Sequence, residues 1–409
     1  MIRVNLERVA ITICALLVPE YIIGWAVRQR LVARQIAKTN AELAITARQE
    51  YAATLNDSAI ALSSDRRVLF ESVMMAAHRE EEKRRATSEA ERAGGVKLIW
   101  HKFRNKYFPD DDDEWTVTHG FFVVMGGFYF LEPGNDPCPL SPEEVEERVK
   151  KGSLELPKKS EINDKSKGDA FSKAVASLQT IWFVMQSIAR PIQHLPLTEL
   201  EVVTLAYTAI HIAMLYFWWS KPLSVSRPVR VLGQHTSTAK DCEATRINEP
   251  TKTIRFVDPL ASLLKAVMGA QDDEVDLSKL QSVPTFYAGK PDDMQILWAD
   301  AIALVFAMVF GAVHCAAWSF AFPTHSEKLI WRIASVALVG VPAIYIALII
   351  LYAFELKRLV KHFLLLSLVG IPFYIAARIA LFVLAFTTLR SLSPEALETV
   401  HWTTIIPHF

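Results

Sequence analysis

The sequence predicts an all-α fold, a polytopic membrane helical bundle of about six transmembrane helices with amphipathic cytoplasmic helices between them. First, hydrophobic residues make up 51% of the 409 residues and gather into blocks. These blocks have the length of about 20 residues that crosses a ~30 Å hydrocarbon core. Second, tryptophans and lysines stand at the ends of several blocks, as at a membrane interface. Third, lysine and arginine concentrate beside alternate block ends, which places both large polar regions in the cytoplasm and both termini outside or in a lumen.

The first predicted transmembrane helix lies within residues 1–27. Its apolar run, about Val9–Val27, contains Pro19 and Glu20, and Pro19 should kink the helix because it removes a backbone hydrogen bond. The basic start is typical of a signal peptide, but no small-x-small cleavage pattern follows, so we expect an uncleaved span.

Three polar or short segments follow the first span. Residues 28–114 are predicted to be a cytoplasmic helical region, and we interpret the acidic run Asp110–Glu114 as a solvated turn rather than a cation site. Residues 115–133 contain an apolar stretch too short to cross, so we expect a membrane-embedded or interfacial segment. Residues 134–169, rich in Pro, Lys and Glu, read as a charged linker.

The remaining chain contains five predicted spans. Residues 170–219 form a transmembrane helical hairpin, whose two helices are joined by a short connection with Pro191 and Pro196. Residues 220–294 form a second cytoplasmic region with an amphipathic helix within 253–269. Residues 295–389 form a three-helix transmembrane bundle, and 390–409 form the C-terminal tail. The sequon Asn56-Asp57-Ser58 would then be cytoplasmic and unmodified.

Ionisable residues within the predicted spans are the candidate functional residues, because charge is costly in hydrocarbon. They are Asp300, His314, Glu20, Arg378 and His211. Asp300 and His314 fall near one face of the fourth span, where they would line a proton or ion path. Alternatively, Asp300 snorkels to the interface and His314 bonds a neighbouring helix. We expect Glu20 to pair with Arg378 in a structural role, and His211 to bond another helix.

Two similar pentapeptides, LVGVP at 338–342 and LVGIP at 368–372, lie in consecutive spans of opposite orientation. A Gly-x-Pro sequence within a span predicts a kink with freed backbone carbonyls. Such kinks either shape the packing or mark a transporter site.

Enzyme signatures are missing from the sequence, which contains no G-x-x-x-x-G-K-[ST], H-E-x-x-H, C-x-x-C or G-x-S-x-G. We therefore predict no catalytic, cofactor-binding or metal-binding residues. The 44 basic residues balance the 44 acidic ones, which argues against a nucleic-acid partner. The four cysteines have no paired spacing, which argues against a disulfide framework. The expected partners are the lipid bilayer and a cytoplasmic protein.

Several long and distinctive motifs are spread along the chain from Pro19 to Phe409. The most distinctive are PEYIIGWAVRQ, WTVTHGFFVVMGGF, DKSKGDAFSKAVASLQTIW, TELEVVTLAY, VPTFYAG and VHWTTIIPHF. These motifs resemble those of a large family of multi-pass membrane proteins from filamentous and mushroom-forming fungi. The resemblance implies an integral membrane protein of fungal origin. It implies no site residue, since the family has no established activity.

Three functions are compatible with these features. A membrane scaffold or interaction protein fits the large charged cytoplasmic segments. A channel or transporter for an ion or small solute fits the polar residues within the spans. An intramembrane enzyme using His119 or His314 fits least. A polar cavity on which the ionisable side chains converge would favour transport, whereas a dry bundle would favour the scaffold.

Overall fold

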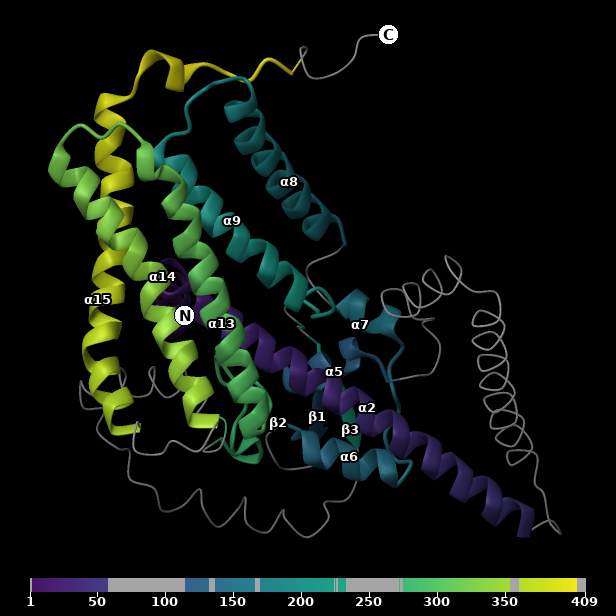
Figure 1. Ribbon diagram of the computed structural model, residues 1–409. Helices are drawn as coiled ribbons and strands as arrows, with labels where there is room; N and C mark the ends of the chain where they lie inside the picture. The colour runs from purple at the N-terminus through teal and green to yellow at the C-terminus, as the bar shows by residue number, and fades with distance from the viewer. Residues whose placement is uncertain are drawn as a thin grey trace, which may run out of the picture.

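The computed structural model describes residues 2–57, 115–131, 137–165, 170–223, 225, 227–232, 272, 275–353 and 360–402. Within these ranges the chain is mostly helical, with one small sheet (Figure 1). The α-helices are α1 (Ile2–Leu17), α2 (Pro19–Asp57), α5 (Val117–Val124), α6 (Pro142–Lys150), α7 (Lys159–Lys165), α8 (Ala170–Ile192), α9 (Glu199–Phe217), α13 (Asp293–Cys315), α14 (His325–Ala353) and α15 (Val360–Thr387).

The strands are β1 (Phe128–Leu131), β2 (Cys138–Pro139) and β3 (Val229–Leu232), and the 3-10 helices are η1 (Leu277–Lys279), η2 (Ala316–Ser319), η4 (Thr388–Ser391) and η5 (Pro394–Leu397). The acidic run at 110–114, the amphipathic segment at 253–269 and the last residues of the tail lie outside the described residues.

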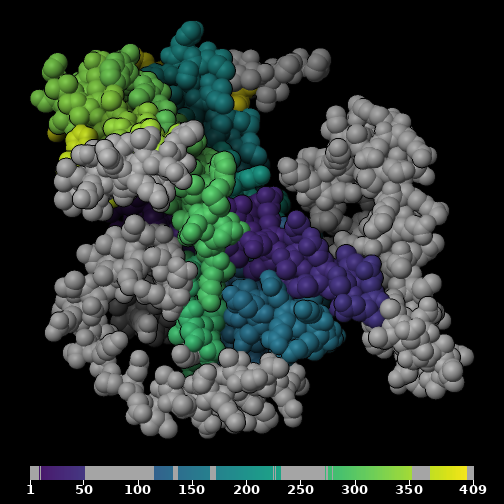
Figure 2. Space-filling model, turned by 60° about the horizontal axis from the view of Figure 1, so that its bottom comes forward, coloured from purple at the N-terminus to yellow at the C-terminus, as the bar shows by residue number. Residues whose placement is uncertain are grey.

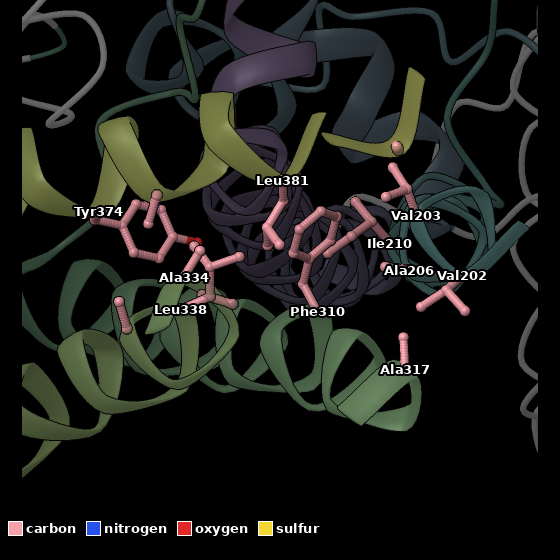
Figure 3. Close-up of a cluster of buried hydrophobic side chains, with 14 of the residues drawn as sticks. Val202, Val203, Ala206, Ile210, Phe310, Ala317, Ala334, Leu338, Tyr374 and Leu381 are labelled. Atoms are coloured by element: carbon pink, nitrogen blue, oxygen red, sulfur yellow. The ribbon is translucent and has the colours of Figure 1, made fainter. Parts of the chain in front are cut away.

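α9, α13, α14 and α15 pack together into a bundle, with α13 in contact with both α14 and α9 (Figure 1). Its core is apolar and joins side chains from all four helices, among them Ile210, Phe310, Leu338 and Leu381 (Figure 3). α13 and α14 approach closely at Gly311, where a Cβ atom would lie 2.7 Å from the carbonyl carbon of Leu338.

Four helical segments of the described chain are long and apolar enough to cross a membrane: α9, α13 with η2, α14, and α15 continued into η4. The bent pair α1 and α2 would make a fifth. α8 is not among them, because polar side chains such as Ser177, Gln179 and Gln186 recur between its apolar ones. The prediction of six spans therefore stays a prediction, with four to five candidates in the structure.

The first predicted span is two helices in the structure rather than one kinked helix. α1 ends at Leu17, α2 begins at Pro19, and the two meet at an angle of 111°. Pro19 lacks the N–H that would continue α1 but suits the first turn of a new helix. The sequence predicts a kink here, but the bend is far sharper than a proline kink within a continuous helix.

The turns at one end of the bundle are bonded to one another. Arg190, near the end of α8, donates to the carbonyls of Pro196, Ala396 and Glu398 at 2.9–3.2 Å. Arg390 bonds Glu327 at 2.8 Å, which joins η4 to the start of α14. The α8–α9 connection, the α13–α14 connection and the segment after α15 therefore share one end, as expected for helices that alternate in direction.

A second unit lies beside the other end of the bundle, and we call it the α/β unit. It comprises α5, α6, α7, η1 and a three-stranded sheet in the order β2-β1-β3, with β1 antiparallel to β2 and parallel to β3. Its core contains Phe128 of β1, Val145 of α6 and Val231 of β3, and it is completed by Val32 and Ile36 of α2.

α2 connects the two units. It has 39 residues and is therefore about 58 Å long. Ile23 and Val27 belong to the core of the bundle, whereas Val32 and Ile36 belong to the core of the α/β unit. In Figure 2, α2 (purple) lies against α13 (green) and against the α/β unit (blue), in agreement with its contacts to α13, α5 and α6. One continuous helix thus fixes the position of the α/β unit relative to the bundle.

α5 lies directly on the backbone of α2, and Gly120 makes this contact possible. A Cβ atom at position 120 would lie 1.9 Å from the carbonyl oxygen of Ala33. His119 stabilises the same helix, because its ring nitrogens bond the backbone and hydroxyl of Thr116 and the carbonyl of Pro157. Both nitrogens are thereby used, which gives His119 a structural role.

The α/β unit takes in parts of three segments of the sequence prediction. Of residues 115–133, expected to be a membrane-embedded or interfacial segment, residues 115–131 are described; they include α5 and β1, whose Phe122 and Phe128 are buried in the core of the α/β unit. Within 134–169, expected to be a linker, β2, α6 and α7 fold and bury Val145 and Ile162. Residues 220–294 contribute β3, whose parallel pairing with β1 joins segments about 100 residues apart. This long-range pairing explains why no local pattern predicts the sheet.

Candidate functional site

Arg378 of α15 lies at the break between α1 and α2. Its Nη1 is 2.6 Å from Oε2 of Glu20, in the first turn of α2, and donates at 3.0 Å to the carbonyl of Leu17, the last residue of α1. Only 3% of the Arg378 side chain and 9% of the Glu20 side chain are exposed. The hydroxyl of Tyr207 on α9 donates to the carbonyl of Leu16. The carbonyls at the end of α1 thus have partners on two other helices.

Aromatic rings cover the ion pair. The guanidinium carbon of Arg378 lies 3.9 Å from the ring centroid of Phe310 and 5.6 Å from that of Tyr374. Tyr374 reaches from α15 with its hydroxyl directed to the interior of the bundle (Figure 3). A cation over ring faces is stabilised electrostatically, and more strongly where water is excluded. The pair is therefore enclosed by protein.

His314 of α13 packs on the other side of this aromatic group. Its ring centroid lies 4.6 Å from that of Phe310 and 5.8 Å from that of Trp331, and the residue is 1% exposed. Nδ1 lies 2.7 Å from the carbonyl oxygen of Phe310. Since a carbonyl only accepts, Nδ1 carries the proton, and Nε2 of the neutral ring is an acceptor. Nε2 has no hydrogen-bond partner in the described part of the chain.

The other two candidate residues lie apart from this centre. Asp300 lies in the first half of α13 and is exposed. His211 of α9 is partly exposed. The structure therefore brings together Glu20, Arg378 and His314, and it separates Asp300 from His314 although both lie on α13.

Sequence reasoning missed Tyr207, Tyr374 and Phe310, which surround the pair. Two spacings contain a usable signal: Tyr374 precedes Arg378 by four residues and Phe310 precedes His314 by four, so each pair shares a helix face. Nothing in the sequence points to Tyr207, because its contact with Leu16 joins distant segments.

A second polar cluster, also missed, surrounds Lys221 just after α9. Its Nζ donates to Oε1 of Gln29 at 2.8 Å and lies 4.3 Å from the ring centroid of Trp218 and 4.8 Å from that of Trp25. The Gln29 side chain donates in turn to the carbonyl of Tyr287 at 2.8 Å. This cluster fastens the end of α9 to α2 and to the 284–288 turn.

We expect the burial of Lys221 to make the stability of the protein depend on pH. Burial lowers the pKa of Lys221 from 10.5 to about 7. Below pH 7 the amine of Lys221 is protonated in both the folded and the unfolded state, so the folded state bears the full cost of burying an ammonium group. Between pH 7 and 10.5 the unfolded state binds more protons, and stability therefore rises with pH. Thermal unfolding in detergent measures this effect. The stability of the wild type relative to that of Lys221→Met should be higher at pH 10 than at pH 7. A difference that does not change with pH would contradict this.

No group of three or more His, Cys, Asp or Glu side chains within the described residues could hold a metal ion. The Arg378 side chain instead provides hydrogen-bond donors at a helix break. These donors can bind acceptors and hold the helix ends in position.

Comparison with known proteins gives one match. Residues 90–242 match the model of a family of unknown function (DUF8562). No curated protein and no solved structure matches the chain. The matched range covers α5 to β3, hence most of the α/β unit together with α8 and α9, and of the candidate residues it contains only His211.

Proposed function

We propose that the protein is a multi-pass membrane scaffold, in which the bundle is the anchor and the α/β unit binds a partner protein at the cytoplasmic face. The observation that supports it most is the role of α2, which is part of both cores. Since one helix contributes Ile23 to the bundle and Ile36 to the α/β unit, the α/β unit is held in a fixed position beside the anchor.

Exposed apolar side chains support the membrane location. Large apolar residues are exposed on the outer faces of the bundle helices, among them Val305, Ile333 and Val383. A soluble protein rarely leaves so many such residues uncovered, whereas lipid would cover them here. Trp298 and Trp318 are exposed near the two ends of the α13–η2 segment, about 30 Å apart along a helix, as at two interfaces. We infer that the match over 90–242 is part of the longer fungal family resemblance.

The interior of the bundle is consistent with an anchor. Glu20 and Arg378 neutralise each other beneath Phe310, and His314 is enclosed by aromatic rings. Buried charges in membrane proteins pair in this way when they stabilise helix packing, although they also mark solute paths.

Site-specific photo-crosslinking tests the scaffold. A crosslinking amino acid at Lys150, exposed on α6, should capture a discrete partner in cells. The same adduct should form in Gly24→Ala, where a new methyl would lie at ordinary contact distances of 3.5 Å from Ala303 Cβ and 4.0 Å from the carbonyl oxygen of Ala299. It should be lost in Gly120→Ala, which disturbs the packing of the α/β unit on α2. A crosslinker at Arg332, at the opposite end, should not give this adduct. No adduct at Lys150, or one that persists in Gly120→Ala, would contradict the proposal.

Solute passage is the second candidate, and the break between α1 and α2 favours it. Discontinuous helices with charged groups at the break form binding sites in membrane transporters. Ion and proton flux into proteoliposomes, compared between wild type, His314→Ala and Asp300→Asn, tests it. Flux abolished by His314→Ala alone would indicate a path through the Arg378 centre rather than along the whole of α13. The absence of flux in the wild type would count against passage of these ions.

A further inference from the structure

Arg378 leaves part of its guanidinium unused at the break between α1 and α2. Nη1 bonds both Glu20 and the carbonyl of Leu17. Nε and Nη2 have no hydrogen-bond partner within the described residues, although the residue is only 2% exposed. An unmade hydrogen bond of a buried charged group is costly, so a ligand that satisfies these donors would be stabilised.

The unused edge has a specific shape. Nε and Nη2 of an arginine present two parallel N–H donors, the geometry that binds a planar oxyanion with two hydrogen bonds. The ring of Tyr374 on α15 lies 5.6 Å from the guanidinium carbon, and its hydroxyl has no hydrogen-bond partner among the described residues.

The charges around Arg378 set how strongly an anion would bind. The titratable side chains near Arg378 are Glu20 of α2, Tyr207 of α9, His314 of α13 and Tyr374 of α15. Of these, Glu20 is the carboxylate paired with Arg378, and its negative charge offsets that of the guanidinium. A bound anion would use other donors than Glu20 does, but it would be repelled by the Glu20 carboxylate and bind weakly while Glu20 is charged.

We propose that the Nε–Nη2 edge of Arg378 binds a small planar monoanion of the carboxylate type at the break between α1 and α2. This inference goes beyond the scaffold and names the solute class for the second candidate function. Binding and passage are separable, because the site can hold an anion in a bundle that conducts none.

Acetate binding to the full-length protein in lipid nanodiscs tests the proposal. Acetate is exchanged for methanesulfonate at constant ionic strength, and affinity is read from the rise in the thermal unfolding midpoint. The wild type should bind acetate weakly, and Glu20→Gln should bind it about tenfold more tightly because the repelling charge is gone. Arg378→Gln should lose the effect. The matched control is Arg332→Gln, since Arg332 also donates to a carbonyl and stacks on an indole but is partly exposed at the end of the bundle.

The outcomes are distinct. An acetate effect that is equal in all four proteins would be a general salt effect and would overturn the proposal. An acetate effect absent from both the wild type and Glu20→Gln would mean that the edge is filled by water only. If Arg378→Gln does not fold, the tighter binding of Glu20→Gln relative to wild type and Arg332→Gln decides alone. Acetate binding without acetate flux would retain the site and reject solute passage.

Discussion

Replacing Arg378 by methionine is expected to lower the free energy of unfolding by about 3–5 kcal/mol, because it leaves the Glu20 carboxylate buried without its partner. The loss includes the hydrogen bond to the carbonyl of Leu17, which ends α1 inside the protein. Glu20→Leu should cost a similar amount, since it leaves the guanidinium unpaired beneath Phe310. Unfolding in mixed micelles measures both values.

The double variant distinguishes a coupled pair from two independent sites. Glu20→Leu combined with Arg378→Met removes both charges, so it should be less destabilised than the sum of the single variants, by at least about 1 kcal/mol. Strict additivity would show that the 2.6 Å contact contributes nothing to stability beyond the separate packing of its side chains. In that case the α1–α2 break would have to be held by Tyr207 and by apolar contacts.

Gly120→Ala is expected to be the most disruptive small substitution in the α/β unit. The added methyl would meet the carbonyl of Ala33 at 1.9 Å, and neither backbone can yield without moving a whole helix. We expect a loss of about 3 kcal/mol or more. Faster proteolytic cleavage within α6 and α7 would show that the α/β unit has separated from α2.

Two glycines on other helices are controls for this experiment. Gly340→Ala places its methyl in open space on α14, and the methyl of Gly24→Ala on α2 makes only ordinary contacts with Ala299 and Ala303 of α13. Both lie inside helices, so alanine should leave stability unchanged or raise it by up to about 1 kcal/mol. A Gly120→Ala variant as stable as these controls would refute the close packing of α5 on α2.

The long apolar helices were predictable because each is a local pattern. α9, α13, α14 and α15 each carry enough apolar residues in one run to be recognised from composition, and Thr198 followed by Glu201 forms the capping box that starts α9. The α/β unit was not predictable in this way. Gly126 and Gly127 read as features of a short membrane segment, but they connect α5 to a strand whose main partner is Val229–Leu232, far along the chain.

The candidate site was predictable in part. Glu20 and Arg378 stand out in apolar runs, and their opposite charges made a pairing plausible; the structure joins them. The expected polar stripe from Asp300 to His314 would require the whole of that face of α13 to have the same environment. In the structure, one end of that face is exposed and the other lies against α14 and α15, and only tertiary packing determines which end is which.

Glycan mapping tests the membrane arrangement most directly. In the proposed arrangement, Asn56, near the end of α2, lies on the side of the α/β unit, and the C-terminal tail lies on the opposite side of the membrane. The protein is expressed in cells that glycosylate secretory proteins, with an acceptor sequence appended after Phe409. We expect one endoglycosidase-sensitive glycan on the appended acceptor and none on Asn56-Asp57-Ser58. A glycan on Asn56, removed by Asn56→Gln, would contradict the account, because the α/β unit would then lie outside the cytoplasm.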